Sequence, residues 1–166
     1  MDIAITKGRT LDTIEVSRPD GSLATTTFPK KGLFPHDAVH LVVESELQLT
    51  AGFWGRVAAG SAPEDIGSIT SSGGHRSSSR AQTPCEDIVE LIQAERLVEC
   101  FEAEMWSERT DLVTFLQVFD AACAQSNIKR PKLSEQSVGK IRKKLDVLCA
   151  RWQRLGIGES LVLFWR

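Results

Sequence analysis

The chain has 166 residues, of which 42% are hydrophobic and 25% are charged, and its formal net charge is −2. A chain of this length is expected to form one domain, residues 1–166, that buries a core without help from a metal or a disulfide. The small net charge gives no field that favours nucleic acid, and no apolar run approaches the roughly 20 residues of a membrane span. We therefore expect a soluble, cytoplasmic protein without a nucleic-acid or membrane partner.

A two-residue alternation of apolar and other side chains predicts strands near the start of the chain, over residues 3–6 and 14–17. The segment 18–22, Arg-Pro-Asp-Gly-Ser, is a strong turn signal and leads into a third, Thr-rich strand over residues 23–28. Residues 160–165 are apolar at every position after the first, which is typical of a strand buried on both faces inside a sheet. We expect this last strand to pair with the N-terminal strands.

Apolar residues spaced three and four apart predict helices across much of the remaining chain. Pro35 suits the first position of a helix that reaches about Leu49, and a short helix follows over residues 53–59. Three longer helices follow, over residues 83–106, 109–125 and 134–155. A capping box, Thr-Pro-Cys-Glu, opens the first of them.

Residues 67–83 are rich in Ser, Gly, Arg and Thr and can bury little apolar surface, so we expect a flexible Ser/Gly-rich loop there. Together these elements predict an α+β fold. In this fold a small antiparallel sheet, made of the three N-terminal strands and the C-terminal strand, packs against a layer of about four to five helices.

One row of polar side chains lies on the first predicted helix. His36, His40 and Glu44 are four residues apart, which places them along one face. Two histidines one turn apart can bind the same divalent ion, and a carboxylate can complete the two-His, one-carboxylate set of catalytic zinc sites. Such an ion lowers the pKa of a bound water to about 7 and makes hydroxide available. A divalent metal, zinc in the first place, is therefore the candidate cofactor.

The row spans about 12 Å of a straight helix, at 1.5 Å per residue, which is too long for all three side chains to reach one ion. Glu44 would then support a histidine from behind, and another ligand would come from elsewhere. The candidates are four glutamates of the capped helix: Glu95, Glu99, Glu102 and Glu104. The string His-Asp-Ala-Val-His at 36–40 also resembles the zinc motif of the coenzyme Q biosynthesis scaffold proteins. Those proteins carry a further glutamate about a dozen residues on, where this chain has Gly52, so the resemblance extends over five residues.

Two other features are candidate interaction surfaces. Phe53 and Trp54 would anchor a protein partner if exposed, but large aromatic side chains are usually buried and we expect them in the core. Three lysines near one face of the last helix form a candidate basic patch: Lys140, Lys143 and Lys144. Because no aromatic side chain is interleaved among them, we interpret this face as a solvated helix surface. We expect all four cysteines to be buried as small apolar residues.

Two functions of different class stay open. The first, which we favour, is a non-enzymatic regulatory or protein-interaction domain, with a protein partner or a second copy of itself. The alternative is a divalent-metal-binding protein, with hydrolase activity, centred on His36 and His40. A glutamate face, Glu95 and Glu99, beside His40 would support the alternative, whereas histidines bonded to the backbone would support the first.

Overall fold

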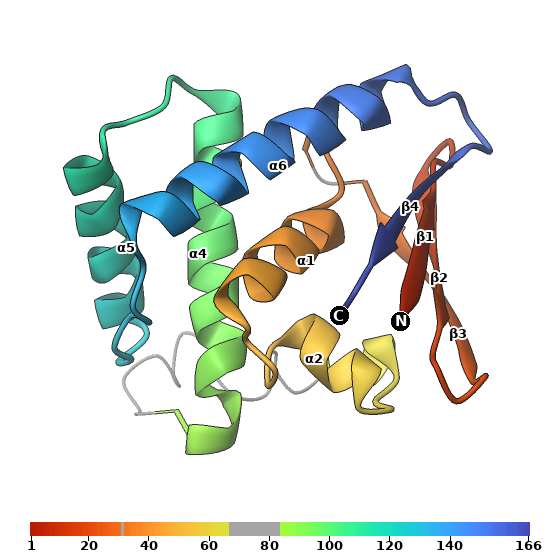
Figure 1. Ribbon diagram of the computed structural model, residues 1–166, viewed down its shortest axis with the longest axis horizontal. Helices are drawn as coiled ribbons and strands as arrows, with labels where there is room; N and C mark the ends of the chain where they lie inside the picture. The colour runs from red at the N-terminus through yellow and green to blue at the C-terminus, as the bar shows by residue number, and fades with distance from the viewer. Residues whose placement is uncertain (31, 67–83) are drawn as a thin grey trace.

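A computed structural model describes residues 1–30, 32–66 and 84–166 and shows the predicted α+β fold (Figure 1). The predicted flexible loop, residues 67–83, lies outside the described residues. Within the described residues the strands form one antiparallel sheet in the order β3-β2-β1-β4. The strands are β1 (Asp2–Thr6), β2 (Leu11–Ser17), β3 (Leu23–Pro29) and β4 (Ser160–Phe164). The predicted combination of three N-terminal strands with the C-terminal strand is confirmed.

β1 and β4 bring the two ends of the chain together (Figure 1). Ile3 of β1 is the register partner of Leu163, and both side chains are buried on the inner face of the sheet. The N-terminal amine of Met1 donates to the carbonyl of Trp165 at 2.9 Å, and the Trp165 amide donates to the Met1 carbonyl at 2.9 Å.

The expectation of a strand buried on both faces inside the sheet is wrong, because β4 is an edge strand and one of its faces is exposed. Leu161 and Leu163 are buried, but Val162 and Phe164 on the opposite face are 47% and 64% exposed. The physical reason is that the described helices all lie on one side of the sheet (Figure 1). The other face of the sheet meets solvent, as antiparallel sheets commonly do.

The helix formed by residues 36–47 lies at the centre of the helical layer. The helices are α1 (His36–Leu47), α2 (Phe53–Ala58), a short 3-10 helix (Glu86–Ile88), α4 (Val89–Trp106), α5 (Leu112–Gln125) and α6 (Glu135–Arg154). α1 packs against α2, α4 and α6, whereas α5 packs on α4, far from the sheet (Figure 1). Among the described residues, none of the helices combines the length and the apolar character needed to cross a membrane.

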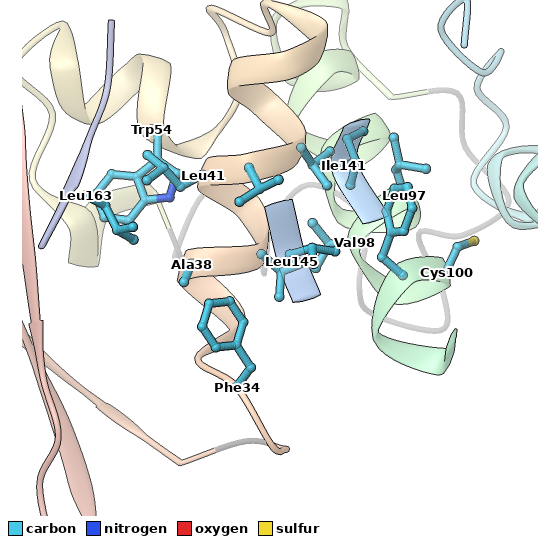
Figure 2. Packing of buried hydrophobic residues seen from close by; sticks show 14 of the residues in the cluster. Phe34, Ala38, Leu41, Trp54, Leu97, Val98, Cys100, Ile141, Leu145 and Leu163 are labelled. Atoms are coloured by element: carbon cyan, nitrogen blue, oxygen red, sulfur yellow. The ribbon is translucent and has the colours of Figure 1, made fainter. Parts of the chain in front are cut away.

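One buried cluster joins the sheet to the helices. It contains Leu163 of β4, Leu41 of α1, Trp54 of α2, Leu97 of α4 and Ile141 of α6 (Figure 2). All five side chains are at most 6% exposed. Since α1 is held by this cluster on several sides, the polar side chains on its remaining face are fixed in direction.

The helix predicted from the capping box begins later than expected. Pro84 and Cys85 are not helical, the 3-10 helix starts at Glu86, and α4 itself starts at Val89. The predicted cap residue, Thr83, lies outside the described residues. Because Cys85 precedes the first turn, it lies on no apolar helix stripe, and it is exposed rather than buried.

The remaining cysteines follow the sequence expectation only in part. Cys100 and Cys123 are buried, and burial raises the pKa of both thiols, to about 11 and about 12. Cys149 is only half-buried. The expectation that all four cysteines are buried is therefore wrong for Cys149 as well as for Cys85, because Cys149 lies at the margin of the α6 apolar face.

Candidate metal site

Three side chains from two helices converge beside the sheet. His36 and His40 lie one turn apart on α1, and Glu95 faces them from α4. The Nε2 atoms of the two histidines are 3.2 Å apart. Oε2 of Glu95 lies 3.1 Å from Nε2 of His40 and 3.7 Å from Nε2 of His36. Three potential metal-binding atoms thus form a compact triangle.

The other nitrogen of each imidazole is already bonded to a carboxylate. Nδ1 of His40 lies 2.9 Å from Oε1 of Glu44, and Nδ1 of His36 lies 2.9 Å from Oε1 of Glu102. A carboxylate can only accept a hydrogen bond, so each Nδ1 carries the proton and donates it. In the neutral imidazoles this leaves the lone pair on Nε2, where both lone pairs point into the triangle with an oxygen of Glu95.

Such an arrangement of acceptor atoms needs a positive charge. Two nitrogen lone pairs and a carboxylate oxygen within 3.1–3.7 Å of one another repel unless protons or a cation lie between them. The repulsion is strengthened by burial, because His40 is only 4% exposed. The triangle therefore holds either protonated histidines or a metal ion.

The pKa values of the metal-free site also show that the triangle attracts positive charge. Burial alone would lower the pKa of His40, but hydrogen bonds to Glu44 and Glu95 outweigh it and raise the pKa to about 10. Burial likewise opposes protonation of His36, yet its bonds to Glu102 and Glu95 raise the pKa to about 9. Burial would raise the pKa of Glu95, but the two histidines hold it well below its usual range. The carboxylates thus attract positive charge to the imidazoles.

Glu44 is anchored by the start of α2. It is fully buried, and its carboxylate accepts hydrogen bonds from the amides of Phe53, at 3.1 Å, and Trp54, at 2.8 Å. Gly52 permits this approach, because a Cβ there would lie 2.6 Å from Oε2 of Glu44. With both oxygens engaged, Glu44 holds the imidazole of His40 in one orientation, as the outer carboxylates of metal sites do.

The three candidate ligand atoms lie close enough together for one ion to contact all of them. Their separations are 3.2, 3.1 and 3.7 Å. Zinc binds imidazole nitrogens and carboxylate oxygens at about 2.0–2.2 Å, so two such ligands of one ion lie about 3–4 Å apart. Two imidazoles and one carboxylate form a donor set that zinc accepts.

The structure divides the predicted histidine row into two roles. His36 and His40 contribute to the triangle, whereas Glu44 contacts Nδ1 on the far side of His40. This division agrees with the length of the row, which is too great for a single ion. Glu44 occupies the supporting position that the sequence left open for it.

Of the four candidate glutamates on α4, two contact the histidines, namely Glu95 and Glu102. Glu99 instead pairs with Arg96 at 2.8 Å, and Glu104 pairs with Arg142 at 2.6 and 2.9 Å. α1 and α4 run antiparallel here, since His40 contacts Glu95 whereas the earlier His36 contacts the later Glu102. The sequence shows a row of histidines and a row of glutamates that could pair in this antiparallel way. Which residues pair depends on how the two helices cross.

A cavity of about 220 Å³ opens beside the triangle. All three candidate ligands line it. The sheet contributes Ile5, Ile14 and Phe28 to its walls, while Phe53 and Leu91 come from α2 and α4. An ion held by the triangle would therefore have an open side facing a mainly apolar chamber.

The aromatic pair is placed mainly by packing. Trp54 is completely buried, and its Nε1 donates to the backbone carbonyl of Asp37 at 2.8 Å. Phe53 is partly buried, with its ring centroid 6.1 Å from that of His40. Phe53 thus contributes to the wall of the cavity and Trp54 to the core, and the pair does not form an exposed anchor.

The candidate basic patch is partly neutralised by a neighbouring carboxylate. Nζ of Lys140 and Nζ of Lys144 lie 3.2 and 3.1 Å from the two carboxylate oxygens of Glu46 on α1. Lys143 is exposed. The pairing of two of the three lysines with one acidic residue leaves little excess positive charge on this face.

Comparisons with protein-family profiles, with curated proteins and with solved structures find no match to this chain.

Proposed function

We propose that the protein binds one divalent zinc ion through His36, His40 and Glu95 and uses it to activate water for hydrolysis. The observation that carries the proposal is the triangle of Nε2, Nε2 and Oε2 atoms, 3.1–3.7 Å apart, with both Nδ1 atoms already bonded to carboxylates. Two histidines and one carboxylate are the ligand set of several hydrolytic zinc sites.

The open side of the triangle supports a catalytic rather than a structural ion. Structural zinc sites are closed by four protein ligands, usually with cysteine among them, whereas catalytic sites keep a position for water. Here the three ligands line a cavity, so a water can occupy the fourth position. Zinc lowers the pKa of such a water to about 7 and supplies hydroxide near neutral pH.

The outer carboxylates support the same role. Glu44 and Glu102 fix the direction of the two imidazoles and make their Nε2 atoms better electron donors. A buried carboxylate with three hydrogen-bond donors, as Glu44 has, is costly to maintain for packing alone. Its function is explained if the imidazole it orients binds a metal.

The test is metal content and zinc affinity of the untagged protein. Mass spectrometry is expected to find close to one equivalent of zinc in the wild type after dialysis against zinc and removal of the excess. Glu95→Gln, which keeps the shape of the side chain, is expected to reduce zinc affinity at least about 100-fold. Glu99→Gln is the matched control on the same helix and is expected to bind like the wild type, because Glu99 pairs with Arg96.

Two outcomes would decide against the proposal. The first is a folded wild-type protein that takes up no zinc, manganese or iron. The second is zinc uptake that is equal in Glu95→Gln and in the wild type, since the metal would then be bound elsewhere. Either outcome would redirect the search to a non-enzymatic regulatory or interaction role. A His36→Ala/His40→Ala double variant tests the histidines in the same way, provided that circular dichroism shows it to be folded.

A further inference from the structure

The cavity next to the triangle is built from side chains of very different character on its opposite walls. One wall carries the candidate ligands, and the opposite wall is apolar, with Ile5 from β1, Ile14 from β2 and Phe28 from β3. Ile5 and Ile14 also belong to the hydrophobic core, so this wall is rigid. A molecule that fills the cavity must place a polar group on the ligand wall and an apolar group on the sheet wall.

The volume limits the size of that molecule. The cavity measures about 220 Å³. An engineered protein cavity of about 150 Å³ holds one benzene molecule. The chamber beside the triangle therefore has room for a polar head together with a body about the size of a benzene ring or a short alkyl chain.

The charges around the triangle limit the head group. Glu44, Glu95 and Glu102 contribute three negative charges, and a divalent ion with two neutral histidines would leave the centre with one net negative charge. A dianionic phosphate would be repelled by this centre and would lose hydration at an apolar wall. A neutral carbonyl oxygen meets neither penalty.

Two further carboxylates line the cavity, Asp12 and Asp37, and their negative charges do not favour an anionic substrate either. Asp12 of β2 accepts a hydrogen bond from the amide of Gly8 at 3.0 Å, and one of its oxygens lies 3.7 Å from Nζ of Lys30. Its charge is thus partly compensated by the turn between β1 and β2 and by the lysine that follows β3. Among the described residues, the cavity offers no arginine or lysine to receive an anionic substrate.

We infer that the substrate is a small neutral carbonyl compound, an ester, lactone or amide, with a compact apolar body; this inference rests on the proposed function. His36, His40 and Glu95 would hold the ion, and the apolar body would pack against Phe28 and the two isoleucines. The ion would supply an activated water whose oxygen adds to the carbonyl carbon, while the bond from this carbon to the leaving oxygen or nitrogen breaks. The proton lost by the water would pass to the leaving group, so an ester or amide would give a carboxylic acid and an alcohol or amine, and a lactone would give one hydroxy acid.

The test uses zinc-loaded protein and hydroxamates, which bind zinc through one constant head and differ in their apolar body. Benzohydroxamate is expected to bind at least about tenfold more tightly than acetohydroxamate, because its ring fills the chamber. Biphenyl-4-hydroxamate is expected to bind more weakly than benzohydroxamate, because its second ring exceeds the available volume. Phenylphosphonate, a dianion with the same ring, is expected to bind at least about tenfold more weakly than benzohydroxamate.

A pair of phenylalanine variants links these affinities to the cavity. Phe28→Ala enlarges the chamber and is expected to reverse the order of the biphenyl and benzo compounds. Phe164→Ala is the control: Phe164 is 64% exposed on the opposite face of the sheet, and its removal should leave the order unchanged.

The result that would overturn the inference is distinct from failure of the proposed function. Stoichiometric zinc together with equal affinity for all three hydroxamates, or tighter binding of the phosphonate, would reject the substrate class and leave the metal site standing. Absence of zinc binding would reject the proposed function first, before any hydroxamate is added.

Discussion

Glu44 is the residue that connects the imidazole of His40 to the protein interior. Its oxygens accept from the imidazole of His40 and from the first two amides of α2. The contact exists only because residue 52 is glycine, since a Cβ at Gly52 would overlap the Glu44 side chain. A small change outside the ligand set should therefore disturb the ligands.

Gly52→Ala is expected to weaken zinc binding at least about tenfold, because the added methyl displaces Glu44 and releases the imidazole that it orients. It should also lower the free energy of unfolding by about 1–3 kcal/mol, the usual effect of overpacking a buried region. Zinc competition and urea denaturation measure the two effects.

Gly139→Ala is the matched control for this substitution. Gly139 lies in α6 with no heavy atom within 4 Å of the added Cβ, so the change should leave zinc affinity unaltered and stabilise the helix by up to about 1 kcal/mol. Equal behaviour of the two alanine variants would contradict the role assigned to Glu44.

Glu102→Gln tests the other outer carboxylate. The amide oxygen can still accept from Nδ1 of His36, but the negative charge that raises the basicity of the ring is lost. We expect zinc affinity to fall about 10- to 100-fold while the fold is retained. Glu99→Gln, one turn earlier on α4, should show no loss. A Glu102→Gln protein that binds zinc as tightly as the wild type would show that this contact is structural only.

At the scale of the elements, α6 stabilises the layer without taking part in the site. Its buried face includes Val138, Ile141 and Leu145, and its first turn is capped by Ser134, whose hydroxyl accepts from the amide of Ser137 at 3.0 Å. This helix packs against α1 and supplies none of the residues that line the cavity.

Ser134→Ala is expected to lower the free energy of unfolding by about 1 kcal/mol, because the first turn loses its cap. Zinc affinity should be unchanged, since α6 supplies none of the candidate ligands. Gln136→Ala, an exposed position in the same turn, is the control and should change stability by only a few tenths of a kcal/mol. A cap variant that lost zinc binding would show that α6 positions the ligands.

Helices and strands could be predicted from the sequence where the pattern of neighbouring residues determines them. The alternation at residues 3–6 gave β1, and Ser134 marked the start of α6. Two predictions were wrong for reasons that lie outside the local sequence. One face of β4 is exposed because the described helices cover only one side of the sheet, and α4 begins at Val89 although its helical pattern starts earlier.

The candidate site could be predicted only for the helix that carries its motif. Spacing on α1 put His36 and His40 on one face, and the length of the row required a ligand from another element. The choice of Glu95 over Glu99 could not be made, because one turn of sliding between α1 and α4 would exchange them. That offset is set by the packing of the whole helical layer.

For the whole molecule, the metal-free site makes stability fall as pH rises, and a bound metal ion should remove this dependence. In the metal-free protein the pKa values of His36 and His40 are raised to about 9 and about 10. A group whose pKa is raised on folding stabilises the fold below its unfolded value, about 6.5, and this contribution is lost as pH rises through the folded value. Metal-free protein should therefore lose several degrees of thermal midpoint between pH 7 and pH 10.

Zinc should abolish this loss, because the ion replaces the protons on Nε2 and stays bound at high pH. The measurement is the thermal midpoint from pH 6 to pH 10, with chelator and with saturating zinc. Glu99→Gln should reproduce both curves of the wild type. Parallel curves with and without zinc would show that the histidines do not exchange protons for metal.

The pairing of β1 with β4 also determines the order in which the chain can fold during synthesis. β1, β2 and β3 leave the ribosome before the residues of the candidate metal site, and β4, the neighbour of β1 on the other side, leaves after them. Until then the β1 backbone is an open edge that can pair with another chain. A chain that stalls or is cut before residue 160 would thus hold every candidate ligand, and its characteristic failure would be aggregation through β1 rather than loss of metal.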